Sequence, residues 1–387
     1  MTAYNKSWVD ALIVKAFSKK LLQKQLLTES QYQLVKEKFF ENFYTPNIFI
    51  CIGLFFFTFI LVSCSAALVI WVSIDYIKSA SAAAGLALFL SFAMLISLEF
   101  IIKSLRHYNS GVDNAFLYIA SISFVTGIFL IFIDYENFMP ILIICLVFFI
   151  SASIRYGDKI LTILAFLCAS GIIFRLVIMS ESFLFSYMPF ILFLFGLACY
   201  FFSIKILKKS IYRYRHAQMQ TLKICCLLFM YLYVNLYFIK ELYTLSSLFL
   251  TIKGGISFAF ILHYSNILVP IIYLYRGIKK KDRDFIHAGL ITLIFSIYTF
   301  YHFSYSVNLN LLLLLSGFLL VLICWLLIRY LKRNPLNFTF IEENEDDFNL
   351  NSEAILISQS LGTSQTHEQE MKFGGGEFGG AGAGGEY

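Results

Sequence analysis

Charged residues are scarce in this sequence: they make up 14% of its 387 residues, while 59% are hydrophobic. A soluble globular protein carries about 25% charged and roughly 45–50% apolar residues. The 43 Phe and 24 Tyr exceed what one soluble core could bury. The composition therefore excludes a disordered chain, a collagen, a disulfide scaffold and an ordinary soluble enzyme. It indicates a protein with several membrane spans.

Motifs that would identify an enzyme, a metal site or a cofactor site are also missing. The sequence has no Walker A motif, no dinucleotide-binding Gly fingerprint, no His-Glu-x-x-His and no Gly-x-Ser-x-Gly. Its eight Cys all lie in apolar runs without zinc-type spacing, so we expect them to pack as small apolar side chains. No basic and aromatic surface of the nucleic-acid-binding kind is indicated. We expect no cofactor, no metal and no nucleic-acid partner.

Runs free of charged residues are long enough to cross a membrane. A spanning helix needs about 20 apolar residues. The runs cover 47–74, 79–98, 114–133, 137–154, 160–174, 182–204, 224–239, 254–275 and 285–328. The last run has 44 residues and must hold two spans that turn near residues 304–308. We therefore expect an all-α fold, a polytopic transmembrane helical bundle of about ten spans within residues 47–332.

The distribution of Lys and Arg predicts how this bundle is oriented. With ten spans, both termini lie on one side of the membrane, and that side carries 26 of the 30 basic residues. Positive charge marks the cytoplasmic side. We expect both termini to be cytoplasmic and the protein to lie in the inner membrane of a bacterium, with the lipid bilayer as its surroundings.

Few charged residues fall inside the expected spans. Glu99 and Lys103 are four residues apart near the end of one span, so a local ion pair is available. Lys223 lies at the cytoplasmic mouth of another span. We expect its side chain to reach out of the membrane towards water.

Residues 1–46 are polar and charged and precede the first apolar run. They predict an amphipathic cytoplasmic hairpin of two helices, the second running from about Glu29 to Phe43 with a cap at Thr28 or Ser30. Two interpretations stay open. The hairpin docks a partner or lies on the anionic leaflet, or it is a solvated segment that only orients the protein.

A resemblance to a family rests on the stretch Leu22-Gln23-Lys24-Gln25-Leu26-Leu27-Thr28-Glu29-Ser30-Gln31. It resembles the opening of an uncharacterised bacterial family of multi-span membrane proteins, which begin with a helical hairpin of the type Leu-x-x-Gly-x-Ile-Ser-x-x-Gln. Here Gln25 stands in the Gly position. The resemblance implies the general architecture and no activity.

Residues 333–387 form a tail of different chemistry. From residue 334 on, the tail holds ten Asp or Glu and one Lys, for a net charge of −9, and it ends in eight Gly spaced by Phe373, Phe378 and Tyr387. Such a segment buries too little apolar surface to fold, so we expect disorder. Its end resembles the Phe-Gly-Gly-Gly tails of bacterial membrane-anchored TPM-domain proteins, although the TPM domain itself is absent. Either the three aromatic residues dock into a cytoplasmic or membrane protein partner, or the tail is a flexible low-complexity end.

Polar residues gather on three of the expected spans. They are Tyr231 and Asn235, then His263 and Asn266, then Tyr298, Tyr301, His302 and Tyr305. Their spacings of three, four and seven put each group on one helical face. They predict either a substrate-binding pocket open to the outer side, in which His263 and His302 bind or relay protons, or an aromatic belt with interhelical hydrogen bonds.

Three functions fit these observations. The first is a non-enzymatic scaffold or complex subunit that engages partners through its cytoplasmic ends. The second is a transporter or channel that uses the polar residues of the seventh to ninth spans. The third is a membrane enzyme acting on a lipid-linked substrate, although the sequence shows no catalytic constellation.

Overall fold

The computed structural model describes residues 3–23, 26–135, 138–179, 187–209, 214–247 and 259–303, together with residues 314, 317, 318, 321, 322, 325 and 329. These residues divide into two compact units. The first unit contains residues 3–11 and those from Glu41 on, and the second contains residues 12–40. The structure thus groups the first described residues of the chain with the membrane body.

The second unit is built from most of α1 (Lys6–Gln23) and from α2 (Glu29–Lys38). Its core consists of Val14, Phe17 and Val35. The hydroxyl of Thr28 accepts a hydrogen bond from the backbone N–H of Gln31, and the side chain of Gln31 accepts one from the N–H of Thr28. This capping box satisfies two N–H groups at the start of α2. The expected pair of helices and the cap at Thr28 are confirmed.

The expected end of the second helix at Phe43 is wrong, because α2 ends at Lys38. The backbone of Tyr44 pairs with a later loop of the chain. Its N–H donates to the carbonyl of Arg106 at 3.0 Å, and its carbonyl accepts from the N–H of Tyr108 at 3.4 Å. The ring of Phe43 stacks on that of Tyr108. A helical backbone at residues 43 and 44 could not make these contacts.

The first unit is helical throughout its described residues, apart from loops and one isolated bridge between Tyr44 and His107. Its α-helices are α3 (Ile48–Val72), α4 (Ala80–Ser104), α5 (Val112–Ile131), α6 (Met139–Tyr156), α7 (Lys159–Met179), α9 (Met188–Leu207), α10 (His216–Val234), α11 (Leu236–Ser247), α12 (Ala259–Lys280) and α13 (Arg283–Phe303). Seven of these helices, α3 to α7, α9 and α10, are long and apolar enough to cross a membrane. The described chain is thus an all-helical, multi-span membrane protein, and the count of ten spans stays a prediction.

Residues with special backbone roles begin and end these helices. Pro140 and Pro189 lie in the first turns of α6 and α9, where a missing N–H removes no helical hydrogen bond. Gly157 ends α6 with a left-handed φ of 77°. Asp158 then caps the start of α7, since its Oδ1 accepts a hydrogen bond from the N–H of Leu161 at 2.8 Å. These residues allow α6 and α7 to form a tight hairpin.

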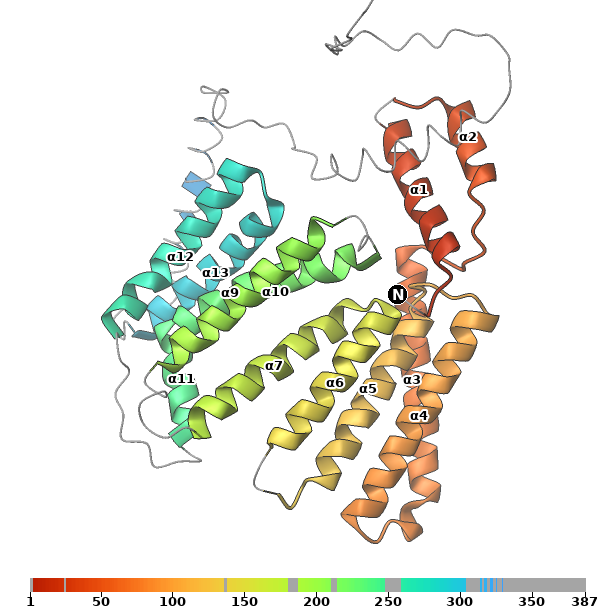
Figure 1. The fold of residues 1–387 in the computed structure, drawn as a ribbon, viewed down its shortest axis with the longest axis horizontal. Coiled ribbons are helices and arrows are strands. Elements are labelled where there is room, and N and C mark those ends of the chain that lie inside the picture. The colour runs from red at the N-terminus through yellow and green to blue at the C-terminus, as the bar shows by residue number, and fades with distance from the viewer. Residues whose placement is uncertain are drawn as a thin grey trace, which may run out of the picture. The chain divides into compact units, whose positions relative to one another are not determined.

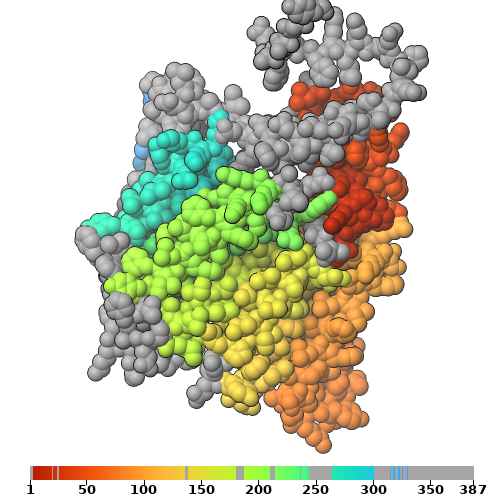
Figure 2. Space-filling view, viewed as in Figure 1, coloured from red at the N-terminus to blue at the C-terminus, as the bar shows by residue number. Residues whose placement is uncertain are grey.

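Consecutive helices of the first unit pack as hairpins (Figure 1). α4 packs on α5, α6 on α7, α9 on α10 and α12 on α13, while α3 packs on α5. Figure 2 shows the orange, yellow and green segments of this unit as neighbours in chain order. α10 also contacts α7, α12 and α13. It therefore lies against two hairpins, and its side chains can link them.

The surface of α3 is apolar and exposed. Of its 25 residues only Val62 is buried, and Phe49 and Trp71 are 79% and 70% exposed. In water each exposed Å² of apolar surface would cost about 25 cal/mol, whereas lipid solvates it. Such a surface is what a membrane span presents to the bilayer.

Candidate functional site

One face of α10 carries polar contacts at every fourth residue. Lys223, Leu227, Tyr231 and Asn235 follow one another at intervals of four and so share a side of the helix. All four contact α12, α13 or the turn between them. In the middle of this face, the carbonyl of Leu227 accepts a hydrogen bond from the hydroxyl of Tyr273 at 3.1 Å. The two ends of the face hold two polar clusters.

The helix breaks at the first cluster. α10 ends at Val234, Asn235 has an extended backbone (φ −80°, ψ 116°), and α11 begins at the next residue. Oδ1 of Asn235 accepts from the N–H groups of Tyr237 and Phe238 at 3.0 and 3.2 Å, and so caps α11. The hydroxyl of Ser265 on α12 donates to the carbonyl of Val234 at 3.0 Å. These bonds satisfy three of the backbone groups that the break frees, namely the N–H groups of Tyr237 and Phe238 and the carbonyl of Val234.

The asparagine cluster consists of the side chains of Tyr231, Asn235, Asn266 and Thr299. Tyr231 donates to Oδ1 of Asn266 at 2.6 Å. Nδ2 of Asn235 lies 2.9 Å from both Asn266 Oδ1 and Thr299 Oγ1, and 3.0 Å from the Tyr231 hydroxyl. All four side chains are buried and none carries a charge. Three helices, α10, α12 and α13, thus meet around a neutral polar centre.

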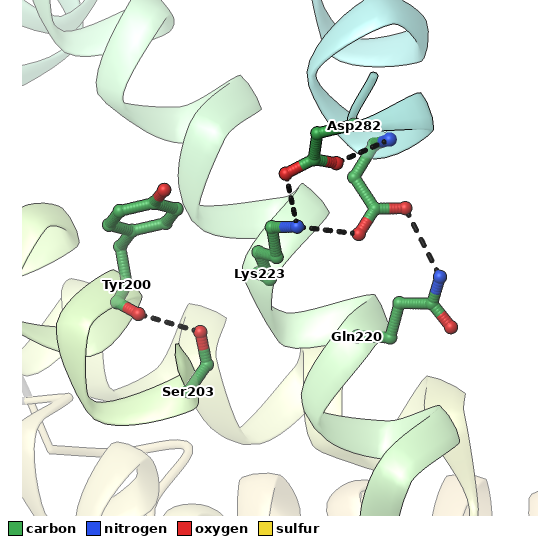
Figure 3. Close-up of polar contacts among 6 residues, drawn as sticks. Tyr200, Ser203, Gln220, Lys223 and Asp282 are labelled. Atoms are coloured by element: carbon green, nitrogen blue, oxygen red, sulfur yellow. Dashed lines mark hydrogen bonds and ion pairs between the residues drawn. The ribbon is translucent and has the colours of Figure 1, made fainter. Parts of the chain in front are cut away.

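The charged cluster lies at the other end of the α10 face and consists of Gln220, Lys223, Asp282 and Asp284 (Figure 3). Nζ of Lys223 lies 2.7 Å from Asp282 Oδ2 and 3.0 Å from Asp284 Oδ2. Nε2 of Gln220 donates to Asp284 Oδ1 at 3.2 Å. Oδ1 of Asp282 accepts from the N–H of Asp284, so it also caps the start of α13. The cluster ties α10 to the turn between α12 and α13.

The expectation that Lys223 reaches out to water is wrong. Its side chain is only 9% exposed, and that of Asp284 is 5% exposed. The turn between α12 and α13 brings two carboxylates to the ammonium group from about 60 residues further along the chain. A paired charge can stay buried where a lone one could not.

The structure brings together three of the eight residues that the sequence singles out, Tyr231, Asn235 and Asn266. Tyr298 lies outside this cluster: it is 50% exposed, and its ring contacts that of Tyr237. The side chains of His263, Tyr301 and His302, and the whole of Tyr305, lie outside the described residues. So do the tail residues Phe373, Phe378 and Tyr387. Binding by any of these residues stays a prediction.

Thr299 and Ser265 belong to the site, and the sequence reasoning missed both. The sequence analysis selected the Tyr and His residues of α13, whereas the buried face of that helix carries Thr292, Ser296 and Thr299. Their spacing of four and three residues is the signal that could have identified this face. Small hydroxyl residues of this kind are typical of the close contacts between membrane helices.

The expected pair of Glu99 and Lys103 is confirmed at 3.3 Å and is part of a larger group. Glu99 Oε1 also accepts from Arg155 Nε at 2.7 Å and from the Tyr156 hydroxyl at 3.0 Å. The group joins the end of α4 to the end of α6. One carboxylate therefore pairs with two basic side chains and offsets one of their two positive charges.

A third polar group holds the first described residues of the chain. The hydroxyl of Tyr4 donates to Asp113 Oδ2 at 3.1 Å, and Asp113 Oδ1 accepts from the N–H of Ser110 at 2.9 Å. Asp113 is buried in the first turn of α5. Burial and the Asp113 carboxylate raise the pKa of Tyr4 well above its usual range, so the phenol stays a donor. This group therefore fixes Tyr4 to the first turn of α5.

Over the part of the chain that the structure describes, no three His, Cys, Asp or Glu lie close enough to hold a metal ion. No family model matches the sequence, and neither a curated protein nor a solved structure is similar to it. The two polar clusters of α10 are therefore the features of this protein that indicate a function.

Proposed function

We propose that this chain is a membrane transporter or channel whose solute site is the asparagine cluster. The break of the membrane helix at Asn235 carries the proposal. Discontinuous helices are costly in a bilayer, and they occur in transporters where side chains and free backbone groups bind a solute. A break that only bent the helix would not need amide and hydroxyl groups from three helices.

The chemistry of the cluster supports a small uncharged polar solute or a monovalent cation. Its groups are amides and hydroxyls, which exchange hydrogen bonds with a polar solute and offer neutral oxygen ligands to a cation. At the break, the negative end of the α10 dipole meets the positive end of the α11 dipole, so the backbone favours neither sign of charge strongly. None of the four side chains offers the carboxylate ligands that commonly hold divalent cations.

Accessibility of the cluster to a polar reagent tests this function without knowledge of the solute. Thr299→Cys, measured by peptide mass spectrometry in liposomes, should react with a small trimethylammonium methanethiosulfonate. Ser91→Cys is the matched control, because Ser91 is an equally buried hydroxyl that binds the carbonyl of Ala120 between α4 and α5. If Thr299→Cys is as unreactive as Ser91→Cys, the cluster is a structural network and the proposal fails.

We also propose that the chain crosses a bacterial inner membrane ten times with both termini in the cytoplasm. The 26 of 30 basic residues on one side support this orientation. Lys208→Cys and Asp134→Cys, both at exposed positions, should then be labelled from opposite sides by an impermeant thiol reagent. Labelling of both from the same side would contradict the topology.

A second proposed role is recruitment of a partner by the cytoplasmic ends. The acidic tail with its three spaced aromatic residues supports this role, and so does the compact hairpin of α1 and α2. The two roles are compatible, since the tail and the asparagine cluster are separate parts of the chain.

A further inference from the structure

The exposed face of α12 changes from apolar to basic along its length. Leu268, Ile272 and Tyr275 follow at intervals of four and three, and they are 57%, 47% and 57% exposed. The same side of the helix continues into Arg276 and Lys279, and Lys280 follows directly. All three basic side chains are exposed in the last turns of α12. A surface that is apolar at one end and cationic at the other matches the two parts of a phospholipid.

The carboxylates nearest to these bases are already engaged. Asp282 and Asp284, which follow α12, both bind Lys223 on the inner side. Among the described residues, no carboxylate pairs with Arg276, Lys279 or Lys280. The ends of α4 and α6 differ, because there Glu99 pairs with both Lys103 and Arg155. Positive charge at the end of α12 is thus available to an outside partner.

Aromatic rings hold two of the three bases. The guanidinium of Arg276 lies 5.3 Å from the ring centre of Phe285, which is itself buried. Nζ of Lys279 lies 5.7 Å from the ring centre of Tyr275. These cation–π contacts limit the freedom of long side chains before a ligand binds. Arg276 can in addition bind a phosphate through two parallel N–H groups.

We propose that the end of α12 is a binding site for an anionic phospholipid. The headgroup phosphate binds Arg276, Lys279 and Lys280, and the acyl chains lie along Leu268, Ile272 and Tyr275. The apolar face favours a lipid over a soluble anion, which would contact the bases alone. Cytoplasmic bases attract anionic lipid in general, whether or not they form a site, so the test must separate a site from that background. The site is independent of solute transport.

A charge-matched pair of variants of the full chain makes this separation. R276Q/K279Q/K280Q removes the proposed site, and K205Q/K208Q/K209Q removes three exposed lysines at the end of α9. Those lysines contact no described aromatic ring or carboxylate. Binding of fluorescent phosphatidylglycerol is measured in phosphatidylcholine nanodiscs. We expect binding to the first variant to be about tenfold weaker than binding to the second, because the second loses only the general attraction of three bases.

Two further arms complete the experiment. K279R/K280R keeps all charges and should bind phosphatidylglycerol as the wild type does, which shows that the site recognises positive charge rather than the lysine side chain itself. Inorganic phosphate at millimolar concentration should not displace the lipid. Equal loss in both triple variants, no loss in the first, or displacement by inorganic phosphate would overturn the proposal.

Discussion

Ser265 donates its hydroxyl to the carbonyl oxygen of Val234, 3.0 Å away, at the point where α10 stops. The bond joins α12 to α10. It satisfies the carbonyl of Val234, which would accept a helical hydrogen bond if α10 continued for another turn. This hydrogen bond therefore stabilises the break at Asn235. The break is therefore held by α12 as well as by its own capping residue.

Ser265→Ala should lower the free energy of unfolding by about 1–3 kcal/mol, because the partly buried carbonyl of Val234 loses its hydrogen-bond partner on α12. Unfolding in mixed micelles with increasing sodium dodecyl sulfate measures the change. Ser65→Ala is the control: Ser65 also binds a backbone carbonyl, but that of Leu61 on its own exposed helix turn. The control should change stability by less than about 0.5 kcal/mol. Equal effects would mean that Ser265 does not support the break.

The charged cluster should show strong coupling in a double-mutant cycle. Lys223→Met leaves the buried carboxylate of Asp284 and the partly buried one of Asp282 without their counter-ion, and Asp284→Asn weakens the hold on the ammonium group. We expect Lys223→Met to cost about 3–5 kcal/mol. The double variant should cost less than the sum of the single ones, since each partner is costly mainly when left alone. Additive losses in the same unfolding assay would show that the two side chains act independently.

Gly111 should not tolerate a side chain. Its φ is 91°, and a Cβ there would lie 2.2 Å from the backbone oxygen of Cys51. Gly111→Ala should therefore lower the free energy of unfolding by about 1–3 kcal/mol or more. Gly85→Ala is the matched control, because Gly85 lies within α4 with open space around it. That change should be neutral or stabilise by up to about 1 kcal/mol, and equal destabilisation of both would contradict the steric argument.

The tail should bind a partner without contributing to folding. Removal of residues after Pro335 should leave the melting temperature of the membrane body unchanged, because the tail has a net charge of −9 and little apolar surface. Replacement of Phe373, Phe378 and Tyr387 by Ala should abolish copurification of a cytoplasmic partner, since each buried ring contributes about 1.5–3 kcal/mol. A triple variant that keeps every partner, or that fails to fold, would contradict this role. These residues lie outside the described part of the chain, so the prediction rests on sequence.

Helix positions and helix ends show which structural features could be predicted from the sequence. The charge-free runs 137–154, 160–174 and 182–204 predicted spans where α6, α7 and α9 lie, and Thr28 was one of the two expected caps of the second helix. These features are local, since a cap or a left-handed Gly acts within one turn of its own position. The end of α2 was predicted wrongly because pairing of Tyr44 with a distant loop decides it.

The polar clusters show what only the tertiary structure decided. The sequence placed Asn235 and Asn266 on expected spans and Lys223 at a span end, but it could not say that the first two bind each other or that Lys223 turns inward to Asp284. Whether a segment can span a membrane depends on that segment alone, because each exposed apolar side chain is stabilised by lipid independently of the others. Which polar groups meet depends instead on the rotation and axial position of whole helices, and packing along their full length sets both. The sequence by itself therefore determined that this chain is a helical membrane protein, and the packing of α10 against α12 and α13 determined where its polar sites lie.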